Sequence, residues 1–332
     1  MKLLKLVPEK TNIGFLKLRN IAVGFSVLLI IASIALVMTR GLNFGVDFVG
    51  GQQFRVTFEK VEEAPIPELR ESIAALNLGD ANIQRFGEPN EVAIRMRLNA
   101  ERGDELQEAD SATVAVSNMI EERFAEQGVR IDGVDAVSGK VSEELLSTGV
   151  YSLVFALIAI SIYIWFRFEW QFGVGALFAL FHDVSLTFGF FALTQLEFNL
   201  NIIAALLTII GYSLNDTIVI DDRIRENLRK YRKMEISNLL DLSINETLAR
   251  TVSTSLTMII VLVSLVLLGP DVIFGFSAAM LFGVIIGTYS SIYIASPVLI
   301  WLGVGPDSFV PIESDSEKAQ RRLAEGYDGA EP

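Results

Sequence analysis

The chain has 332 residues, of which 51% are hydrophobic and 20% are charged, and its formal net charge is −13. This mixture is too apolar for one soluble domain and too charged for a chain that lies wholly inside lipid. The absence of Cys excludes a disulfide scaffold and thiol-based metal or nucleophile chemistry. Between Gly41 and Thr148 the chain carries 10 basic and 21 acidic residues, which excludes nucleic-acid binding there because phosphate contacts need a basic surface.

The chain begins with a basic segment and a first apolar run. Residues 1–20 contain four Lys and one Arg, and residues 21–39 are long enough to cross the roughly 30 Å of hydrocarbon in a bilayer. This start resembles a secretory signal peptide, but the run is long for one and no small-x-small cleavage site precedes Arg40. We therefore predict an uncleaved membrane helix over 21–39, with residues 1–20 in the cytoplasm.

Residues 41–148 predict a small α/β domain outside the membrane. Strands are indicated by short β-prone segments with alternating polarity, and helices by a helical period. Gly79–Asp80 and Pro89–Asn90 supply turns between elements. The resulting order, β-α-β-β-α-β, is the ferredoxin-like pattern, a fold that hosts many activities. The expected strands are 52–59, 81–86, 91–98 and 129–137, and the expected helices are 66–76 and 104–127.

Residues 149–302 contain five more apolar runs of spanning length. The fold class is therefore an α-helical integral membrane protein with six transmembrane helices and a small ferredoxin-like domain. Gly283 and Gly287 form a small-xxx-small pair in the last run, which predicts close helix packing. The runs are 149–166, 173–194, 200–221, 251–269 and 272–302, joined by a cytoplasmic loop at 222–250 and followed by a polar, disordered tail at 303–332.

The distribution of Lys and Arg predicts the orientation. The N-terminal segment and the 222–250 loop are basic, whereas the connections near 194–199 and 269–271 contain no Lys or Arg. By the positive-inside rule, both termini lie in the cytoplasm and residues 41–148 lie in the periplasm.

One acid, Asp216, lies inside the apolar run 200–221. A carboxylate at membrane depth costs at least about 2.5–3.5 kcal/mol, so it marks an ion or proton pathway or a substrate site. The alternative is an acid satisfied by Asn215, Ser213 or a neighbouring helix, or one that reaches water near Asp221. Asn215 and Thr217 flank the acid, where they could bind it or act as helix packing contacts.

Three other polar residues lie in or beside the predicted spans. His182, the only His, and Asp183 lie within 173–194, where they could carry protons or form a structural hydrogen-bonded pair. A metal site is not expected with one His and no Cys. Arg250 precedes the fifth span, and its position alone favours a cytoplasmic anchor that reaches the headgroups.

Several strings, in this order, resemble one family. GVDFVGG (45–51), FHDV (181–184) and YSLNDTIVIDDRIREN (212–227) are followed by NETLARTVSTSLT (245–257) and GTYSSIYIASP (287–297). The set closely resembles the SecF family of protein-export membrane subunits, within the resistance-nodulation-division superfamily. The resemblance covers about residues 15–303.

The resemblance implies a subunit that works with SecD to promote late steps of export through the Sec translocase, powered by the proton gradient and without a cofactor. It implies that this chain is half of a pseudo-twofold bundle in the bacterial inner membrane, with Asp216 as a proton-relay carboxylate and Arg250 facing it. His182, Asp183, Asn215 and Thr217 are secondary candidates. The implied partners are SecD, the SecYEG translocon, YajC, a YidC-type insertase, membrane lipid and unfolded exported polypeptides.

Other functions remain open at this stage. The alternative within the superfamily is a half-transporter for small molecules or lipids, although a domain of about 100 residues leaves little room for a binding pocket. An enzyme is not expected, because the chain has no convincing Ser–His arrangement, no HExxH and no Walker-type phosphate loop.

Overall fold

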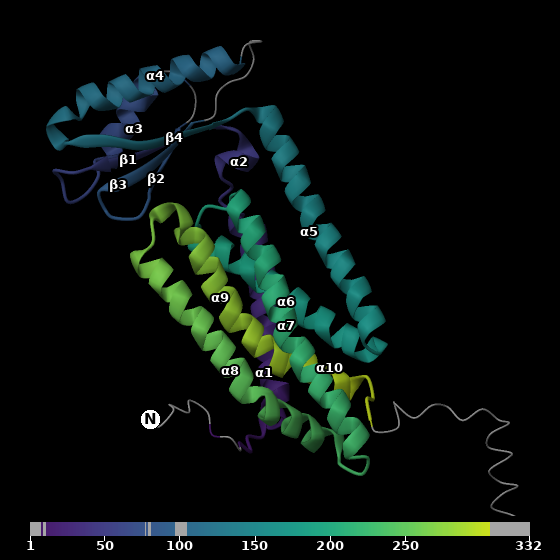
Figure 1. Cartoon of the computed structure of the whole chain (residues 1–332). Helices are drawn as coiled ribbons and strands as arrows, with labels where there is room; N and C mark the ends of the chain where they lie inside the picture. Colours follow the sequence, from purple (N-terminus) through teal and green to yellow (C-terminus); the bar gives the residue numbers. More distant parts are fainter. Residues whose placement is uncertain (1–7, 9–10, 77, 79–80, 97–104, 306–332) are drawn as a thin grey trace, which may run out of the picture.

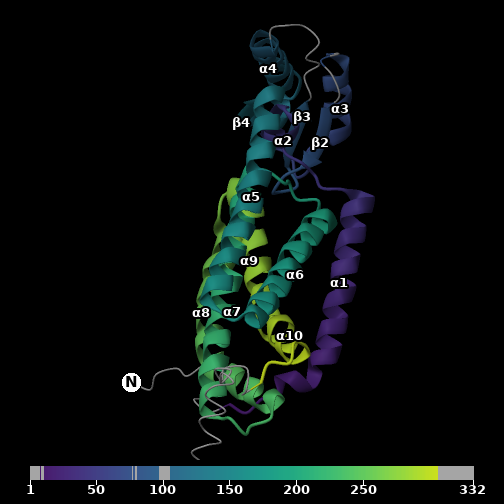
Figure 2. The ribbon, with the colours of Figure 1, turned by 90° about the vertical axis from the view of Figure 1, so that its right-hand side faces the viewer.

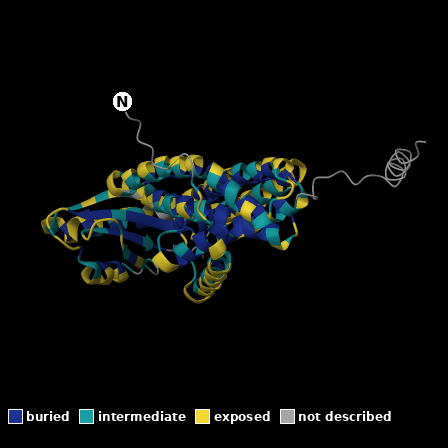
Figure 3. Ribbon diagram, turned by 90° about the horizontal axis from the view of Figure 1, so that it is seen from below, coloured by how far each residue is buried: buried dark blue, intermediate teal, exposed yellow. Residues whose placement is uncertain are grey.

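The protein consists of an α/β domain above a bundle of long helices (Figure 1). The computed structural model describes residues 8, 11–76, 78, 81–96 and 105–305. The predicted tail, from residue 306 onward, and most of the first ten residues lie outside the described residues. Buried residues concentrate in the sheet and in the middle of the bundle (Figure 3).

The α/β domain has the predicted ferredoxin-like element order. Its four strands form an antiparallel sheet in the order β2-β3-β1-β4. Alternate residues such as Phe54, Val56 and Ile94 are fully buried in a core with residues of α3 and α4. The elements are β1 (Gly51–Phe58), α3 (Ile66–Ala75), β2 (Ala81–Arg85), β3 (Glu91–Met96), α4 (Glu105–Arg123), η2 (Ala125–Gln127) and β4 (Val129–Val137).

The other face of the sheet is polar and is turned toward the helical bundle. Arg95 of β3 donates to Gln53 of β1 and forms an ion pair at 2.8 Å with Glu197, in the connection between two bundle helices. Asn43 joins the same network, donating to Gln84 at 3.1 Å and accepting from Arg95 at 2.7 Å. Helices α3 and α4 lie on the side away from the bundle (Figures 1 and 2).

The GVDFVGG segment forms the connection from the first membrane helix into the sheet. It contains the short helix α2 (Val46–Val49), and the glycines that follow it have positive φ angles of 76° (Gly50) and 112° (Gly51). A Cβ on Gly50 would lie 3.1 Å from the Cα of Gly139. Asp47 accepts a hydrogen bond at 2.9 Å from the backbone N–H of Leu200. These residues shape and fasten the connection.

Six helices are long and apolar enough to cross a membrane in the described part of the chain. We compared the most apolar 18-residue stretch of each helix. In α6, in α7 and in the helix that begins with α9, 56% of the residues of this stretch are buried, whereas in α1, α5 and α8 only 6–17% are buried. The first three are therefore the centre of the bundle. The helices are α1 (Arg19–Arg40, preceded by η1, Phe15–Leu18), α5 (Gly139–Arg167), α6 (Trp170–Thr194), α7 (Leu200–Lys230), α8 (Ile236–Leu268) and α9 (Phe274–Ser290, preceded by η3, Asp271–Ile273).

Small residues allow the central helices to approach closely. A Cβ on Gly283 of α9 would overlap the side chain of Ile209 of α7, and one on Gly287 would lie 2.9 Å from the Cβ of Ser213. The predicted role of this glycine pair in helix packing is confirmed.

Two parts of the bundle differ from the simplest picture of apolar runs joined by loops. The connection expected over 222–250 is mostly helical, since α7 continues to Lys230 and α8 begins at Ile236. The last span is interrupted by a π-helix, η4 (Ser291–Ala295), and continues as α10 (Ser296–Trp301).

Helix α5 follows β4 directly, with Ser138 as its N-cap.

Candidate functional site in the helical bundle

Asp216 lies on α7 and points toward α8. Its side chain is buried, and its Oδ1 atom accepts a hydrogen bond at 3.3 Å from the hydroxyl of Thr251. Its Oδ2 atom is buried and has no hydrogen-bond partner among the described residues. Because buried polar atoms are nearly always paired, a half-satisfied carboxylate marks a place where a proton or a further partner is accommodated.

Arg250 precedes Thr251 on α8 and is close enough for its charge to act on Asp216. Its side chain is exposed, and no ion pair joins it to an acid in the described part of the chain. In this conformation the guanidinium is therefore free to take a partner.

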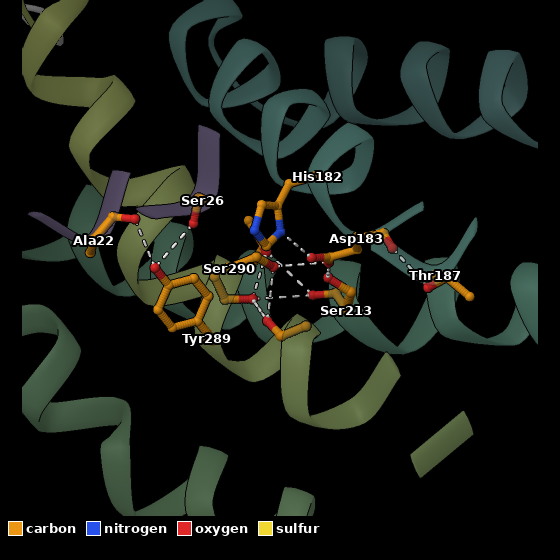
Figure 4. Close-up of polar contacts among 11 residues, drawn as sticks. Ala22, Ser26, His182, Asp183, Thr187, Ser213, Tyr289 and Ser290 are labelled. Carbon is orange, nitrogen blue, oxygen red and sulfur yellow. Dashed lines mark hydrogen bonds and ion pairs between the residues drawn. The ribbon is translucent and has the colours of Figure 1, made fainter. Parts of the chain in front are cut away.

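His182 and Asp183 form a second buried polar cluster (Figure 4). The two side chains are 1% and 0% exposed, and His182 Nδ1 lies 2.9 Å from Asp183 Oδ1. The other carboxylate oxygen, Oδ2, accepts from Ser213 of α7 at 2.5 Å and from Ser290 of α9 at 2.8 Å. Asp183 therefore joins three helices, α6, α7 and α9.

The neighbouring ring of Tyr289 extends this cluster to α1. It lies 6.0 Å from the imidazole of His182, and its hydroxyl donates to the backbone carbonyl of Ala22 at 2.9 Å and contacts the hydroxyl of Ser26 at 3.0 Å (Figure 4). The Nε2 atom of His182 is buried without a partner among the described residues. His182 is thus held through one nitrogen only.

Further hydroxyl groups lie between the same helices, and together with the two buried carboxylates they form what we call the polar layer. Thr217 Oγ1, one residue after Asp216, lies 2.9 Å from Ser291 Oγ of the π-helix. Toward α8, Ser255 contacts Thr288 at 2.7 Å and accepts from Tyr212 at 3.3 Å. The layer crosses α6, α7, α8 and α9.

The structure brings together some of the sequence-predicted residues and not others. Asp216 and Thr217 lie in the polar layer, and so do His182 and Asp183. Asn215 is exposed on the outer face of α7 and takes no part in the layer. The sequence did not assign roles to Ser290 and Ser291, although hydroxyl residues in sequence within an apolar helix are a signal that could have found them.

The end of α7 contains a further buried acid. Acids at the end of a membrane span usually belong to a solvated cap of ion pairs, and Asp222 does pair with Arg167 at 2.8 Å. Asp221, in contrast, is only 3% exposed. The side chain of Asp221 faces the bundle, because α7 remains helical through this segment.

No group of three or more His, Asp or Glu side chains that could hold a metal occurs in the described residues.

An α/β domain inserted after the first of six candidate membrane helices, with acids buried between the central helices, defines a multi-pass membrane protein with ionisable groups inside its bundle. Two family models match the chain: "SecD/SecF GG Motif" over residues 35–60 and "Protein export membrane protein SecD/SecF, C-terminal" over residues 117–305. The chain belongs to the SecD/SecF family, as a SecF-type protein translocase subunit.

Curated relatives support the same assignment over nearly the whole chain. Protein translocase subunit SecF of Cereibacter sphaeroides is 42% identical over 307 residues, which is 91% of this chain and 93% of the relative. The same subunit of Rhodobacter capsulatus is 44% identical over 309 residues, with 91% and 92% covered. That of Rickettsia prowazekii is 41% identical over 297 residues, with 89% and 93% covered.

Two solved structures share the fold. A crystal structure of SecDF from Thermus thermophilus, described as a translocon-associated membrane protein, is 31% identical with a TM-score of 0.78, and the match covers 90% of this chain. A structure of SecDF in a super-membrane-facing form is 29% identical with a TM-score of 0.64 and covers 97%. The chain spans 39% and 40% of those SecDF chains, so each holds a large part that this chain lacks.

Proposed function

We propose that this chain pairs with SecD and uses the proton motive force to promote late steps of protein export across the bacterial inner membrane. The family assignment supports the export role. The proposal of proton coupling depends on one observation, which is that Asp216 is buried with one carboxylate oxygen unpaired, beside an Arg250 that has no ion pair among the described residues.

This arrangement suits a group that gains and loses a proton. An ionised Asp216 attracts the guanidinium of Arg250, and protonation removes that attraction, so Arg250 exchanges its partner and α7 and α8 repack against each other. One charge that crosses a membrane potential of 100 mV supplies about 2.3 kcal/mol, enough to bias a two-state equilibrium about fifty-fold. The repacking would move the α/β domain, which assists the emerging polypeptide. The Asp183 cluster, with its hydrogen bonds already formed, is the secondary proton-handling candidate.

We infer that SecD covers the outer face of α7. That face is formed by small and polar residues that are exposed when the chain is considered without a partner, namely Ala204, Thr208, Gly211 and Asn215. Small and polar residues are the usual contacts between membrane helices, and exposed amides at membrane depth need partners. The face lies next to Asp216, so SecD would complete the site. The SecYEG translocon, YajC and a YidC-type insertase are proposed as further partners.

The proposed orientation places both termini in the cytoplasm and the α/β domain in the periplasm. Phe15 and Val304, near the two ends of the described chain, belong to one core cluster at the end of the bundle that is opposite the domain. Arg167, Arg223 and Arg225 lie at that end, and the two short domain-side connections, 194–199 and 269–271, contain no Lys or Arg, in keeping with the positive-inside rule.

The test is export of a secreted reporter in cells that depend on this protein, complemented with Asp216→Asn. Asparagine keeps the size of the side chain and the bond to Thr251 but cannot be ionised. We expect export to fall by up to about fifty-fold, the factor that 2.3 kcal/mol supplies. The matched control is Asp222→Asn, the same change at a half-exposed acid of the same helix, which should export normally.

Membrane abundance and co-purification with SecD are measured in parallel. Lost export with normal abundance and pairing supports a chemical role for Asp216. Full export by Asp216→Asn would contradict proton coupling at this residue, while the family assignment would stand.

A further inference from the structure

A cleft of about 530 Å³ lies between the polar face of the sheet and the domain-side ends of α8 and α9. Gln84 and Arg95 belong to its sheet side, and Leu267, Val272 and Phe274 belong to its bundle side. Its volume is in the range of known ligand sites, about 300–1,000 Å³. The proton-coupled site described above does not use this cleft.

The charged residues that line the cleft balance one another. They are two Arg and two Glu, and two of them, Arg95 and Glu197, form an ion pair with each other. A third, Arg85, pairs with Glu63 outside the cleft. The lining therefore carries no net charge, which suits a neutral partner better than an anionic lipid headgroup.

One residue of the lining has an unused hydrogen-bond acceptor. Asn199 lies in its lining, and the Oδ1 atom of its side chain is buried with no hydrogen-bond partner among the described residues. Asn199 is the N-cap of α7, yet its side chain makes no capping bond. An unpaired buried carbonyl oxygen is unfavourable, and a rotation of the Asn199 side chain toward the cleft would let an incoming N–H group pair with it.

The bundle side of the cleft exposes apolar side chains. Leu267, Val272 and Phe274 are 73%, 53% and 39% exposed, respectively, in this chain. They lie opposite Gln84, whose amide group can both donate and accept hydrogen bonds. One wall thus matches the backbone of a peptide and the other matches apolar side chains.

We propose that this cleft holds a short extended segment of the unfolded polypeptide during its export. Unfolded polypeptide is neutral along its backbone, presents N–H groups to Asn199 and Gln84, and carries the apolar side chains that the opposite wall accommodates. Four extended residues span about 13 Å, so the cleft contacts only a few residues at a time and recognises no particular sequence. This inference depends on the proposed export function and assigns the polypeptide-contacting surface within it.

Site-specific photo-crosslinking tests the proposal in membranes that contain the complete translocase. A photoreactive phenylalanine analogue replaces Val272 in the cleft or, as a control, Val114, which is exposed on α4 at the outer side of the domain. A tagged secretory polypeptide is stalled during export. We expect adducts with the stalled polypeptide from position 272 and none from position 114.

A second variant probes the buried acceptor. Asn199→Ala should reduce the yield of the adduct at position 272 about fivefold, the factor that corresponds to a hydrogen bond of about 1 kcal/mol. Asn238→Ala, which truncates an exposed amide at the other end of the molecule, should leave the yield unchanged. Membrane abundance and SecD co-purification show whether Asn199→Ala folds.

The outcomes separate this inference from the proposed function. Adducts only with lipid or only with SecD at position 272 overturn the inference, and so does equal capture at positions 272 and 114. If Asp216→Asn abolishes export while position 272 captures no polypeptide, proton coupling stands and the cleft assignment fails. If position 272 captures polypeptide while Asp216→Asn exports normally, the cleft assignment stands and proton coupling fails.

Discussion

At the scale of single residues, the two buried acids of the polar layer differ in how completely they are paired. Asp183 contacts His182, Ser213 and Ser290 through both of its oxygens, whereas Asp216 accepts one hydrogen bond and leaves Oδ2 unpaired. A fully paired carboxylate fastens helices, and a half-paired one is available for chemistry. We therefore propose that Asp183 mainly fastens the helices and that any proton handling by it is secondary to that of Asp216.

This difference predicts the effect of removing a single hydroxyl. Ser290→Ala deletes one donor to Asp183, and polar contacts between membrane helices contribute about 0.6–1.7 kcal/mol, so the free energy of unfolding should fall by that amount. Unfolding of the purified protein in detergent measures it. Ser264→Ala, which removes an exposed hydroxyl bonded only to its own helix, should stay within about 0.5 kcal/mol. A stability equal to that of the wild type for Ser290→Ala would contradict the fastening role.

At the scale of elements, close contacts among α6, α7 and α9 define the centre of the bundle. Gly189 of α6 and Gly283 of α9 each face a side chain that a Cβ would overlap, namely Ser33 of α1 and Ile209 of α7. Close approach of helix backbones is the main source of helix association in lipid. The positions of these glycines therefore determine how near the helices come.

A single methyl group tests this packing. Gly283→Ala should destabilise the protein by about 1–3 kcal/mol, because Ile209 must leave its position to make room. The matched control is Gly24→Ala in α1, where a Cβ has nothing within 4 Å. That change should be neutral or stabilise by up to about 1 kcal/mol, since Ala favours the helix. Equal thermal stability of the two variants in detergent would show that the contact at Gly283 is unimportant.

The elements differ in how well the sequence predicts them. The strands of the α/β domain and the glycine pair of α9 follow from patterns that depend on local geometry, namely alternation along a strand and spacing along a helix. Asp216 and the Asp183 pair stood out because ionisable groups are rare in apolar runs. The sequence does not decide whether the chain stays helical past Asp221, because a solvated charged helix and a charged loop have similar compositions.

Other features have no signal in one sequence. The π-helix at 291–295 is defined by backbone N–H groups that bond to carbonyls five residues away instead of four. Neither the composition nor the periodicity of the sequence indicates this change of hydrogen-bond partner. The unpaired atoms of Asp216 and Asn199 depend on which residues of distant segments lie opposite them. The cleft also depends on how the domain sits above the bundle, which is a property of the whole fold.

At the scale of the whole molecule, the α/β domain is fastened to the bundle by a small polar joint. Arg95 and Glu197 have side chains only 13% and 16% exposed, and Asn43 binds both Arg95 and the backbone of Gln195. Charge-assisted bonds with little solvent contact are stronger than exposed ones. This joint keeps the cleft between the domain and the bundle in a defined shape.

Arg95→Ala should loosen the joint and broaden the range of domain positions, because it removes a charged hydrogen bond of about 1.5–3 kcal/mol. The natural chain has no Cys, so spin labels at Val114→Cys and Leu268→Cys report the distance between the domain and the bundle without background. Arg130→Ala, at an exposed ion pair of the same domain, is the control and should leave the distribution unchanged. An unchanged distribution in Arg95→Ala would mean that backbone contacts alone hold the joint.

The direct passage from β4 into α5 has a mechanical consequence. Helix α5 has 29 residues and is therefore about 43 Å long, and only 6% of the residues in its most apolar window are buried. If a helix of that length tilts by about 5° about its cytoplasmic-side end, its domain-side end moves by about 4 Å. β4 is joined to that end of α5 without an intervening loop. A small tilt of α5 in the lipid would therefore move the sheet by several ångströms, a distance that would change the width of the cleft.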